Sequence, residues 1–265
     1  MPDALSLPLA ALAGSSWVHL PVWALVALGG TALVAGVVRG FAGFGAGLVM
    51  VPAFAMIVGP ADAVPLEVFL ELLALARLLP EALPRVEART VLAPGIAACL
   101  LIPVGSIALV AVEPDLLTRL MSLLVLAFVA LLASGWRRRR RPGTATLLGV
   151  GALSGTLTGA AGIGGPPMVV TLMAGPDEAA GNRANLIGYF GLTQSAALAI
   201  FAWRGLFGLS HLVFGLLLGV PFFSGLHLGA RLFRGLPWSG AERTYRGVVL
   251  VLLVAIALAG LVAGS

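Results

Sequence analysis

Long apolar stretches constrain this chain more than any other feature of its sequence. Residues 91–112, 116–135, 209–228 and 247–262 each hold 16 to 22 residues with few or no charges, and a helix needs about 20 apolar residues to span a bilayer. Only 10% of all residues are charged and the mean hydropathy is +1.07, which excludes a soluble surface. The stretches lack the two-residue alternation of a membrane β-barrel. The sequence therefore predicts an all-α, polytopic membrane helical bundle.

The arginines predict an orientation in the membrane. All 16 cationic residues are arginines, and cationic residues gather in the cytoplasmic loops of membrane proteins. Arg137–Arg141 lie between two apolar stretches, so we assign this linker to the cytoplasm. Spans that alternate outward from the linker place 12 of the 16 arginines inside, at positions 85, 89, 137–141, 183, 231, 234, 243 and 246. The predicted topology is therefore self-consistent.

Several classes of function and processing are not expected. The segment 1–17 lacks a cationic region before its apolar residues, so we do not expect a cleaved signal peptide. Cys99 is the single cysteine, which excludes an internal disulfide. His19, His211 and His227 lack the spacing of a metal site, and the absence of a P-loop leaves ATP-driven transport unsupported. The arginine run is explained by topology and by anionic lipid headgroups, so membrane lipid is an expected partner and nucleic acid is not.

A glycine-rich segment occurs twice, 119 residues apart. The matching pairs are Gly40 with Gly159, Ala42 with Ala161, Gly43 with Gly162, and Gly45 with Gly164. Three predicted spans follow each copy, and the arginine topology starts the first copy outside and the second inside. The sequence thus predicts two inverted-topology repeats with broken or re-entrant helices, as in many secondary transporters. The predicted divisions are an N-terminal segment (1–21), a first repeat (22–136), a cytoplasmic linker (137–143) and a second repeat (144–265).

Both glycine-rich segments are expected to interrupt a helix. Pro166 and Pro167 are adjacent prolines, which cannot continue a helix but are favoured in its first turn, so we expect a half-helix from there to Met173. The segment Gly45–Gly47 is expected to open its counterpart through Met56. Helix amino termini attract anions, which makes these breaks the predicted substrate site. Its backbone members are Gly43, Gly45, Ala46, Gly47, Gly162, Gly164, Gly165, Pro166 and Pro167. The alternative is that the glycines only allow close helix packing, above all Gly40, Gly43 and Gly47.

Charged residues within the predicted spans are the other candidates for the site. Glu67 and Glu71 lie one helical turn apart, and buried carboxylates in a span mark transport pathways, proton relays or ion pairs. Either carboxylate is a candidate for proton coupling, or for a structural pair with Arg39 or Arg77. Arg39 and Arg183 are candidates for binding the anion, although Arg183 also fits a cytoplasmic topology charge. Asn185, Tyr189, Thr193, Gln194 and Ser195 add polar groups from the next span.

The duplicated glycine-rich breaks, the Gly-x-Gly-Gly-Pro-Pro sequence at 162–167 and the small central linker resemble the sulfite exporter TauE/SafE family, also called the TSUP family. The resemblance runs from about residue 22 to residue 262. It implies a multi-pass secondary transporter of the bacterial inner membrane, which moves sulfur-containing or organic anions such as sulfite, sulfoacetate or thiosulfate and is coupled to protons or to the membrane potential. The sequence Gly-Ala-Gly-Leu at 45–48 departs from the commoner first-half pattern of the family.

The predicted function is secondary transport of a small anion by alternating access, with no cofactor and no enzymatic activity. An anion channel lined by the same breaks, or a transporter of small organic carboxylates, stays open as an alternative. A membrane-embedded enzyme needs a cluster of acid, base or metal-binding groups, for which the sequence offers only Glu67 and Glu71. A second copy of the chain, in a homodimer, is a further candidate partner.

Overall fold

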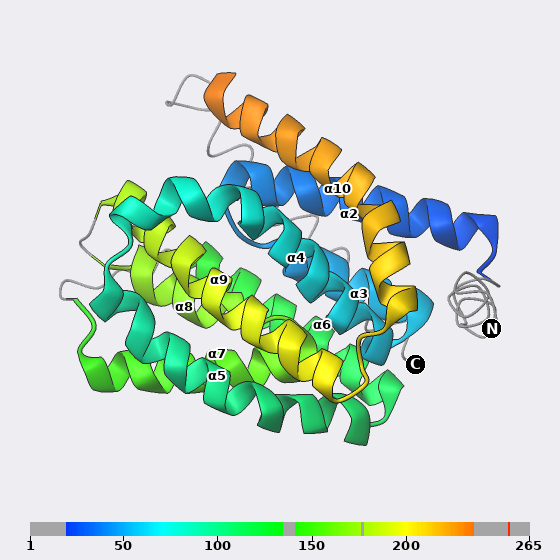
Figure 1. Ribbon diagram of the computed structural model, residues 1–265, viewed down its shortest axis with the longest axis horizontal. Coiled ribbons are helices and arrows are strands. Elements are labelled where there is room, and N and C mark those ends of the chain that lie inside the picture. Colours follow the sequence, from blue (N-terminus) through cyan, green and yellow to red (C-terminus); the bar gives the residue numbers. More distant parts are fainter. Residues whose placement is uncertain (1–19, 135–140, 176–177, 236–253, 255–265) are drawn as a thin grey trace, which may run out of the picture.

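The computed structural model describes residues 20–134, 141–175 and 178–235, together with Val254. These residues form helices and no strand (Figure 1), which confirms the predicted all-α bundle. The helices are α2 (Val22–Ala42), α3 (Ala46–Val58), α4 (Pro60–Ala82), α5 (Ala88–Ala111), α6 (Pro114–Ala133), α7 (Thr144–Ala161), α8 (Gly165–Met173), α9 (Ala179–Trp203) and α10 (Leu209–Gly235), with a short 3-10 turn at Leu83–Arg85.

Five helical segments are long and apolar enough to cross a membrane: Val22–Phe41, Ala88–Ala111, Pro114–Leu131, Gly181–Trp203 and Leu209–Leu232. Three of them match the predicted spans 91–112, 116–135 and 209–228. The predicted span 247–262 lies outside the described residues, apart from Val254, and so do residues 1–19 of the N-terminal segment.

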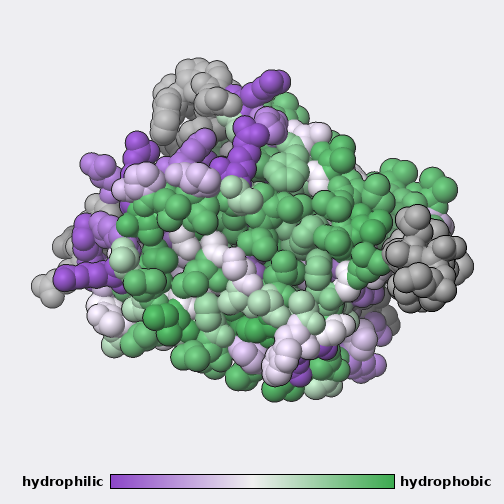
Figure 2. Space-filling model, in the orientation of Figure 1, coloured by the Kyte–Doolittle hydropathy of each residue, from purple (hydrophilic) through white to green (hydrophobic). Residues whose placement is uncertain are grey.

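The surface of the bundle is apolar where lipid would contact it. Along α5, large apolar side chains are exposed at three- and four-residue spacing: Leu92, Ile96, Leu100, Val104, Ile107 and Val110. Figure 2 shows hydrophobic residues over most of the visible face, whereas hydrophilic residues gather most densely toward its upper left. A soluble helix buries its apolar stripe, so this outward stripe indicates a hydrocarbon environment.

The helices of the two halves pair in a reciprocal way. The most extensive contacts join α2 to α10 and α7 to α5, so the first helix of each repeat packs on a later helix of the other repeat. In Figure 1, α2 runs from right to left and its counterpart α7 from left to right, while α5 runs from left to right and its counterpart α10 from right to left. Corresponding helices of the two halves therefore point in opposite directions, as the inverted-repeat prediction requires.

Glycines allow these helix pairs to approach until their backbones touch. A Cβ atom added at Gly36 or Gly40 of α2 would stand 2.1 Å from a backbone carbonyl oxygen of α10, and one added at Gly155 or Gly159 of α7 would stand 2.2 Å from a carbonyl oxygen of α5. The 119-residue offset relates Gly36 to Gly155 and Gly40 to Gly159. Small residues at such crossings are the usual basis of helix association in lipid. For Gly40, close packing is thus the role that the structure shows.

The short helices α3 and α8 lie inside the frame formed by these pairs. Every residue of α3 from Ala46 to Ala55 is buried, and α3 packs on α2 and α4, while α8 packs on α7 and α9. The interrupted segments are therefore enclosed by protein, as non-helical backbone at membrane depth must be.

A pair of alanine substitutions in α2 tests the packing of the frame. We expect Gly36→Ala to destabilise the protein by about 1–3 kcal/mol, because overpacking forces the backbones apart. Gly29→Ala is the matched control, since nothing lies within 4 Å of a Cβ atom at Gly29 and alanine is the better helix former. Thermal unfolding of the detergent-solubilised protein measures both. Equal melting temperatures for the two variants would contradict backbone contact between α2 and α10.

Candidate functional site

The first helix break depends on two glycines with left-handed backbone geometry. Helix α2 ends before Gly43, which has φ 78°, and α3 begins after Gly45, which has φ 94°. Residues with a Cβ atom rarely adopt these left-handed angles, whereas glycine adopts them readily. The two glycines therefore end one helix and allow the next to begin without a proline. An Nη1 hydrogen of Arg39 is donated to the carbonyl oxygen of Gly43. The predicted half-helix, expected through Met56, is confirmed as α3 and continues to Val58.

The second break repeats the left-handed glycine at its start and adds the paired prolines, whereas its second glycine, Gly164, has φ −82°. Helix α7 ends before Gly162, which has φ 63° and is the counterpart of Gly43 at the 119-residue offset. The Ser154 hydroxyl donates a hydrogen bond to the carbonyl oxygen of Gly164. Pro166 and Pro167 occupy the first turn of α8, which ends at Met173 as predicted. Each break is therefore closed by a polar side chain from the helix that precedes it.

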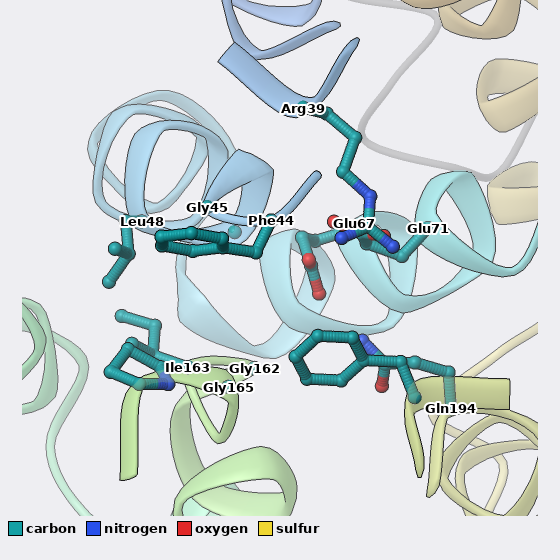
Figure 3. A pocket seen from close by; sticks show the side chains of 13 residues that line it. Arg39, Phe44, Gly45, Leu48, Glu67, Glu71, Gly162, Ile163, Gly165 and Gln194 are labelled. Atoms are coloured by element: carbon teal, nitrogen blue, oxygen red, sulfur yellow. The ribbon is translucent and has the colours of Figure 1, made fainter. Parts of the chain in front are cut away.

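The two breaks meet at a small cavity (Figure 3). Its volume is about 30 Å³. The first repeat supplies Arg39, Phe44, Gly45, Gly47, Leu48, Glu67 and Glu71, and the second supplies Gly162, Ile163, Gly165, Pro166, Phe190 and Gln194.

Arg39 and Glu71 form a buried ion pair beside the cavity. Nη2 of Arg39 lies 3.0 Å from Oε2 of Glu71, and the two side chains are 1% and 7% exposed. The Arg39 guanidinium carbon also lies 5.5 Å from the ring centroid of Phe190, a distance typical of a cation–π contact. Of the two predicted pairings, the structure shows the one with Arg39, whereas Arg77 is exposed.

Glu67 lies between the two breaks. Its side chain is buried, with 1% of the residue exposed. A Cβ atom at Gly47 would stand 2.7 Å from its Oε1 atom, and one at Gly162 would stand 3.2 Å from its Oε2 atom. Among the residues that the structure describes, none donates a hydrogen bond to that Oε2 atom. Glu67 thus contacts both repeats at the point where they meet.

The cavity brings together many of the predicted site residues but not all of them. Arg39, Gly45, Gly47, Glu67, Glu71, Gly162, Gly165, Pro166 and Gln194 line it, together with the aromatic and aliphatic residues Phe44, Leu48, Ile163 and Phe190, which were not predicted. Gly43, Ala46, Gly164 and Pro167 lie within the breaks without lining the cavity. Their roles in binding remain predictions.

Gln194 is the polar candidate of α9 that lines the cavity; Arg183, Asn185, Tyr189, Thr193 and Ser195 do not. Arg183 is exposed, and its side chain lies against Gly43. Asn185 accepts a hydrogen bond of 2.7 Å from the backbone N–H of Glu87, and so connects α9 to the start of α5. Tyr189 is buried and packs edge-on against Phe190. A place in the substrate pathway remains a prediction for each of them.

A second polar contact joins the start of α4 to the start of α10. Nε2 of His211 lies 3.0 Å from Oδ1 of Asp62, and the His211 Nδ1 atom accepts a hydrogen bond of 3.3 Å from the Gly208 N–H. This contact is the counterpart of the Asn185–Glu87 contact, which joins α9 to α5. The contacts thus hold α4 and α9, which carry Glu67, Glu71 and Gln194, near their first turns: α4 to α10 of the other repeat, and α9 to α5 of the other repeat.

The fold and the cavity together define a class: a multi-pass helical membrane protein in which two oppositely directed broken helices meet at a buried polar site, as in secondary transporters. The chain belongs to the sulfite exporter TauE/SafE family, since the model of that family matches residues 9–260. No curated protein and no solved structure matches the chain at a significant level. The match confirms the resemblance that the glycine-rich breaks indicated. The family is one of membrane transporters.

Substitutions in the ion pair test whether Arg39 is neutralised by Glu71. We expect Glu71→Gln to cost about 3–5 kcal/mol of stability, because it leaves a buried guanidinium without its counter-charge. The double variant Arg39→Met with Glu71→Leu should recover much of this loss, since neither charge remains. Arg77→Gln on the exposed face of α4 is the control, and thermal unfolding in detergent is the measurement. A Glu71→Gln variant as stable as the control would contradict the pairing.

Proposed function

We propose that the chain is a secondary active transporter of small, sulfur-containing anions, such as sulfite, sulfoacetate or thiosulfate, that works by alternating access. The observation that carries this proposal is the convergence of two half-helix amino termini on one buried cavity beside Arg39. Unpaired N–H groups and the helix dipole favour an anion there. The family's name, sulfite exporter, supports the substrate class.

The two half-helices contribute unequally to such a site. The first turn of α3 carries N–H groups at Ala46, Gly47 and Leu48, whereas in α8 the prolines at 166 and 167 have none. We therefore assign most of the anion's backbone hydrogen bonds to α3. The role of α8 is to bring Gly165 and the apolar proline rings against the anion and to exclude water.

Alternating access requires that one end of the cavity opens while the other stays closed. The contacts Asp62–His211 and Asn185–Glu87 are made together in this structure, in which the cavity is small. We assign each contact to the closed state of its own end, so that opening an end breaks one contact and keeps the other. A channel would need both ends open at once, and its flux would saturate poorly.

The location that fits this function is the bacterial inner membrane, with the arginine run 137–141 in the cytoplasm. In this orientation Arg85 and Arg89 are also cytoplasmic, whereas Glu113 and Asp115, at the opposite ends of α5 and α6, face outward.

Uptake into proteoliposomes tests the site. A methyl group at Gly47 would stand 2.7 Å from Oε1 of Glu67 and 3.2 Å from the carbonyl oxygen of Gly162, so Gly47→Ala fills the cavity where the breaks meet. We expect it to lower saturable uptake of sulfite, sulfoacetate and thiosulfate by about 5- to 150-fold, the effect of about 1–3 kcal/mol of overpacking. Gly149→Ala in α7 is the matched control, since nothing lies within 4 Å of that position. Uptake by Gly47→Ala equal to that of the control would remove the cavity from the pathway.

Cysteine labelling tests the orientation. In a Cys99→Ala background, we expect an impermeant maleimide to label Ala88→Cys only in inside-out vesicles, and Asp115→Cys only in right-side-out spheroplasts. Both positions are exposed; Ala88 begins α5, whereas Asp115 lies in the first turn of α6, just beyond the other end of α5. The reverse pattern would contradict the assignment of the arginine run to the cytoplasm.

A further inference from the structure

The charged side chains that line the cavity do not balance. Among the described residues that line it, the charged ones are Arg39 from α2 and Glu67 and Glu71 from α4; the lining residues of α3, α8 and α9 are uncharged. Arg39 forms its ion pair with Glu71, at 3.0 Å, and the other nearby cation, Arg183 of α9, lies against Gly43 outside the lining. Glu67 is therefore the lining carboxylate that has no ion-pair partner of its own among the described residues, in a site that the proposed function assigns to an anion.

The carboxylate of Glu67 lies where the proposed anion would bind. Its two carboxylate oxygens lie against Gly47 and Gly162, at the point where the half-helix termini converge, so any anion held by those termini lies next to it. A buried Glu67 Oε2 atom and a buried Gln194 Oε1 atom each lack a hydrogen-bond donor within the described part of the chain. Both atoms are acceptors when Glu67 is ionised, and an anion supplies no donor to either.

Two negative charges at contact distance in a buried cavity repel strongly, because bulk water screens them little there. A proton on Glu67 removes the repulsion and converts the carboxylate from an acceptor into a group that can donate an O–H hydrogen bond. The same proton therefore makes Glu67 a ligand for the anion instead of a competitor.

We propose that Glu67 carries a proton whenever the anion occupies the cavity, so that one proton and one anion bind together and cross the membrane in the same direction. This inference rests on the proposed function and adds the sign of the coupling. In an exchange of anion for proton, each would have to displace the other, whereas charges of opposite sign favour each other's binding. By linkage, the factor by which the proton raises anion affinity is the factor by which the anion raises the proton affinity of Glu67.

The experiment measures proton uptake when thiosulfate binds to the purified protein. Thiosulfate is chosen because it does not titrate near neutral pH, as sulfite does. We use a weakly buffered solution with a pH-sensitive dye, at a pH where Glu67 is ionised in the anion-free protein and protonated in the complex. There we expect about one proton to be taken up per bound thiosulfate. Over the same pH range the affinity for thiosulfate should fall about tenfold for each unit of pH increase.

Glu67→Gln imitates the protonated carboxyl group. We expect this variant to bind thiosulfate without proton uptake and with an affinity that no longer depends on pH. Glu113→Gln, which makes the same chemical change at an exposed residue outside the cavity, should retain the proton uptake of the wild type.

The wild-type measurement decides the inference even where Glu67→Gln does not fold. Thiosulfate binding with no proton uptake, or with proton release, overturns the coupling and leaves the proposed function standing. An absence of saturable binding and uptake of thiosulfate, sulfoacetate and sulfite overturns the proposed function, and the coupling falls with it.

Discussion

The structure depends on one constraint: a helix that is interrupted inside a membrane exposes backbone polar groups that lipid cannot satisfy. The interruption at Gly43–Gly45 is tolerated because Arg39 donates to the Gly43 carbonyl oxygen, and the interruption before Gly165 is tolerated because Ser154 donates to the Gly164 carbonyl oxygen. A buried arginine needs a counter-charge in turn, which Glu71 supplies. The ion pair, the breaks and the enclosed position of α3 and α8 are thus consequences of the same requirement.

The surrounding frame meets that requirement by close packing. At the crossings of α2 with α10 and of α5 with α7, glycines such as Gly40 and Gly159 let the helix backbones touch. The closely packed helix pairs flank the two half-helices, while the central helices α4 and α9 carry Glu67, Glu71 and Gln194 and α2 adds Arg39. The protein thus places a polar centre inside a packed frame that joins its two halves.

Much of this arrangement follows from the sequence. The prolines at 166 and 167 require a helix break, and the 119-residue repeat locates its partner at Gly43–Gly45, where left-handed glycines do the same without proline. The sequence does not decide whether Glu71 pairs with Arg39 or with Arg77. The choice depends on how α2 packs against α4, and helical spacing along α4 carries no information about that contact. Phe44 and Phe190 were missed because an aromatic residue in an apolar span resembles one that faces lipid. Their sequence signals are weak: Phe44 lies between two glycines of the break, and Phe190 lies one turn before Gln194.

The position of a bound anion decides whether the cavity between the two breaks is the substrate site. Selenite is a heavier analogue of sulfite, and anomalous diffraction from crystals grown with it would locate the selenium atom. We predict a peak between the amino termini of α3 and α8, within hydrogen-bonding reach of the Gly47 N–H and next to Glu67. A peak found only at the exposed arginines, with the cavity between the two breaks empty, would contradict this prediction.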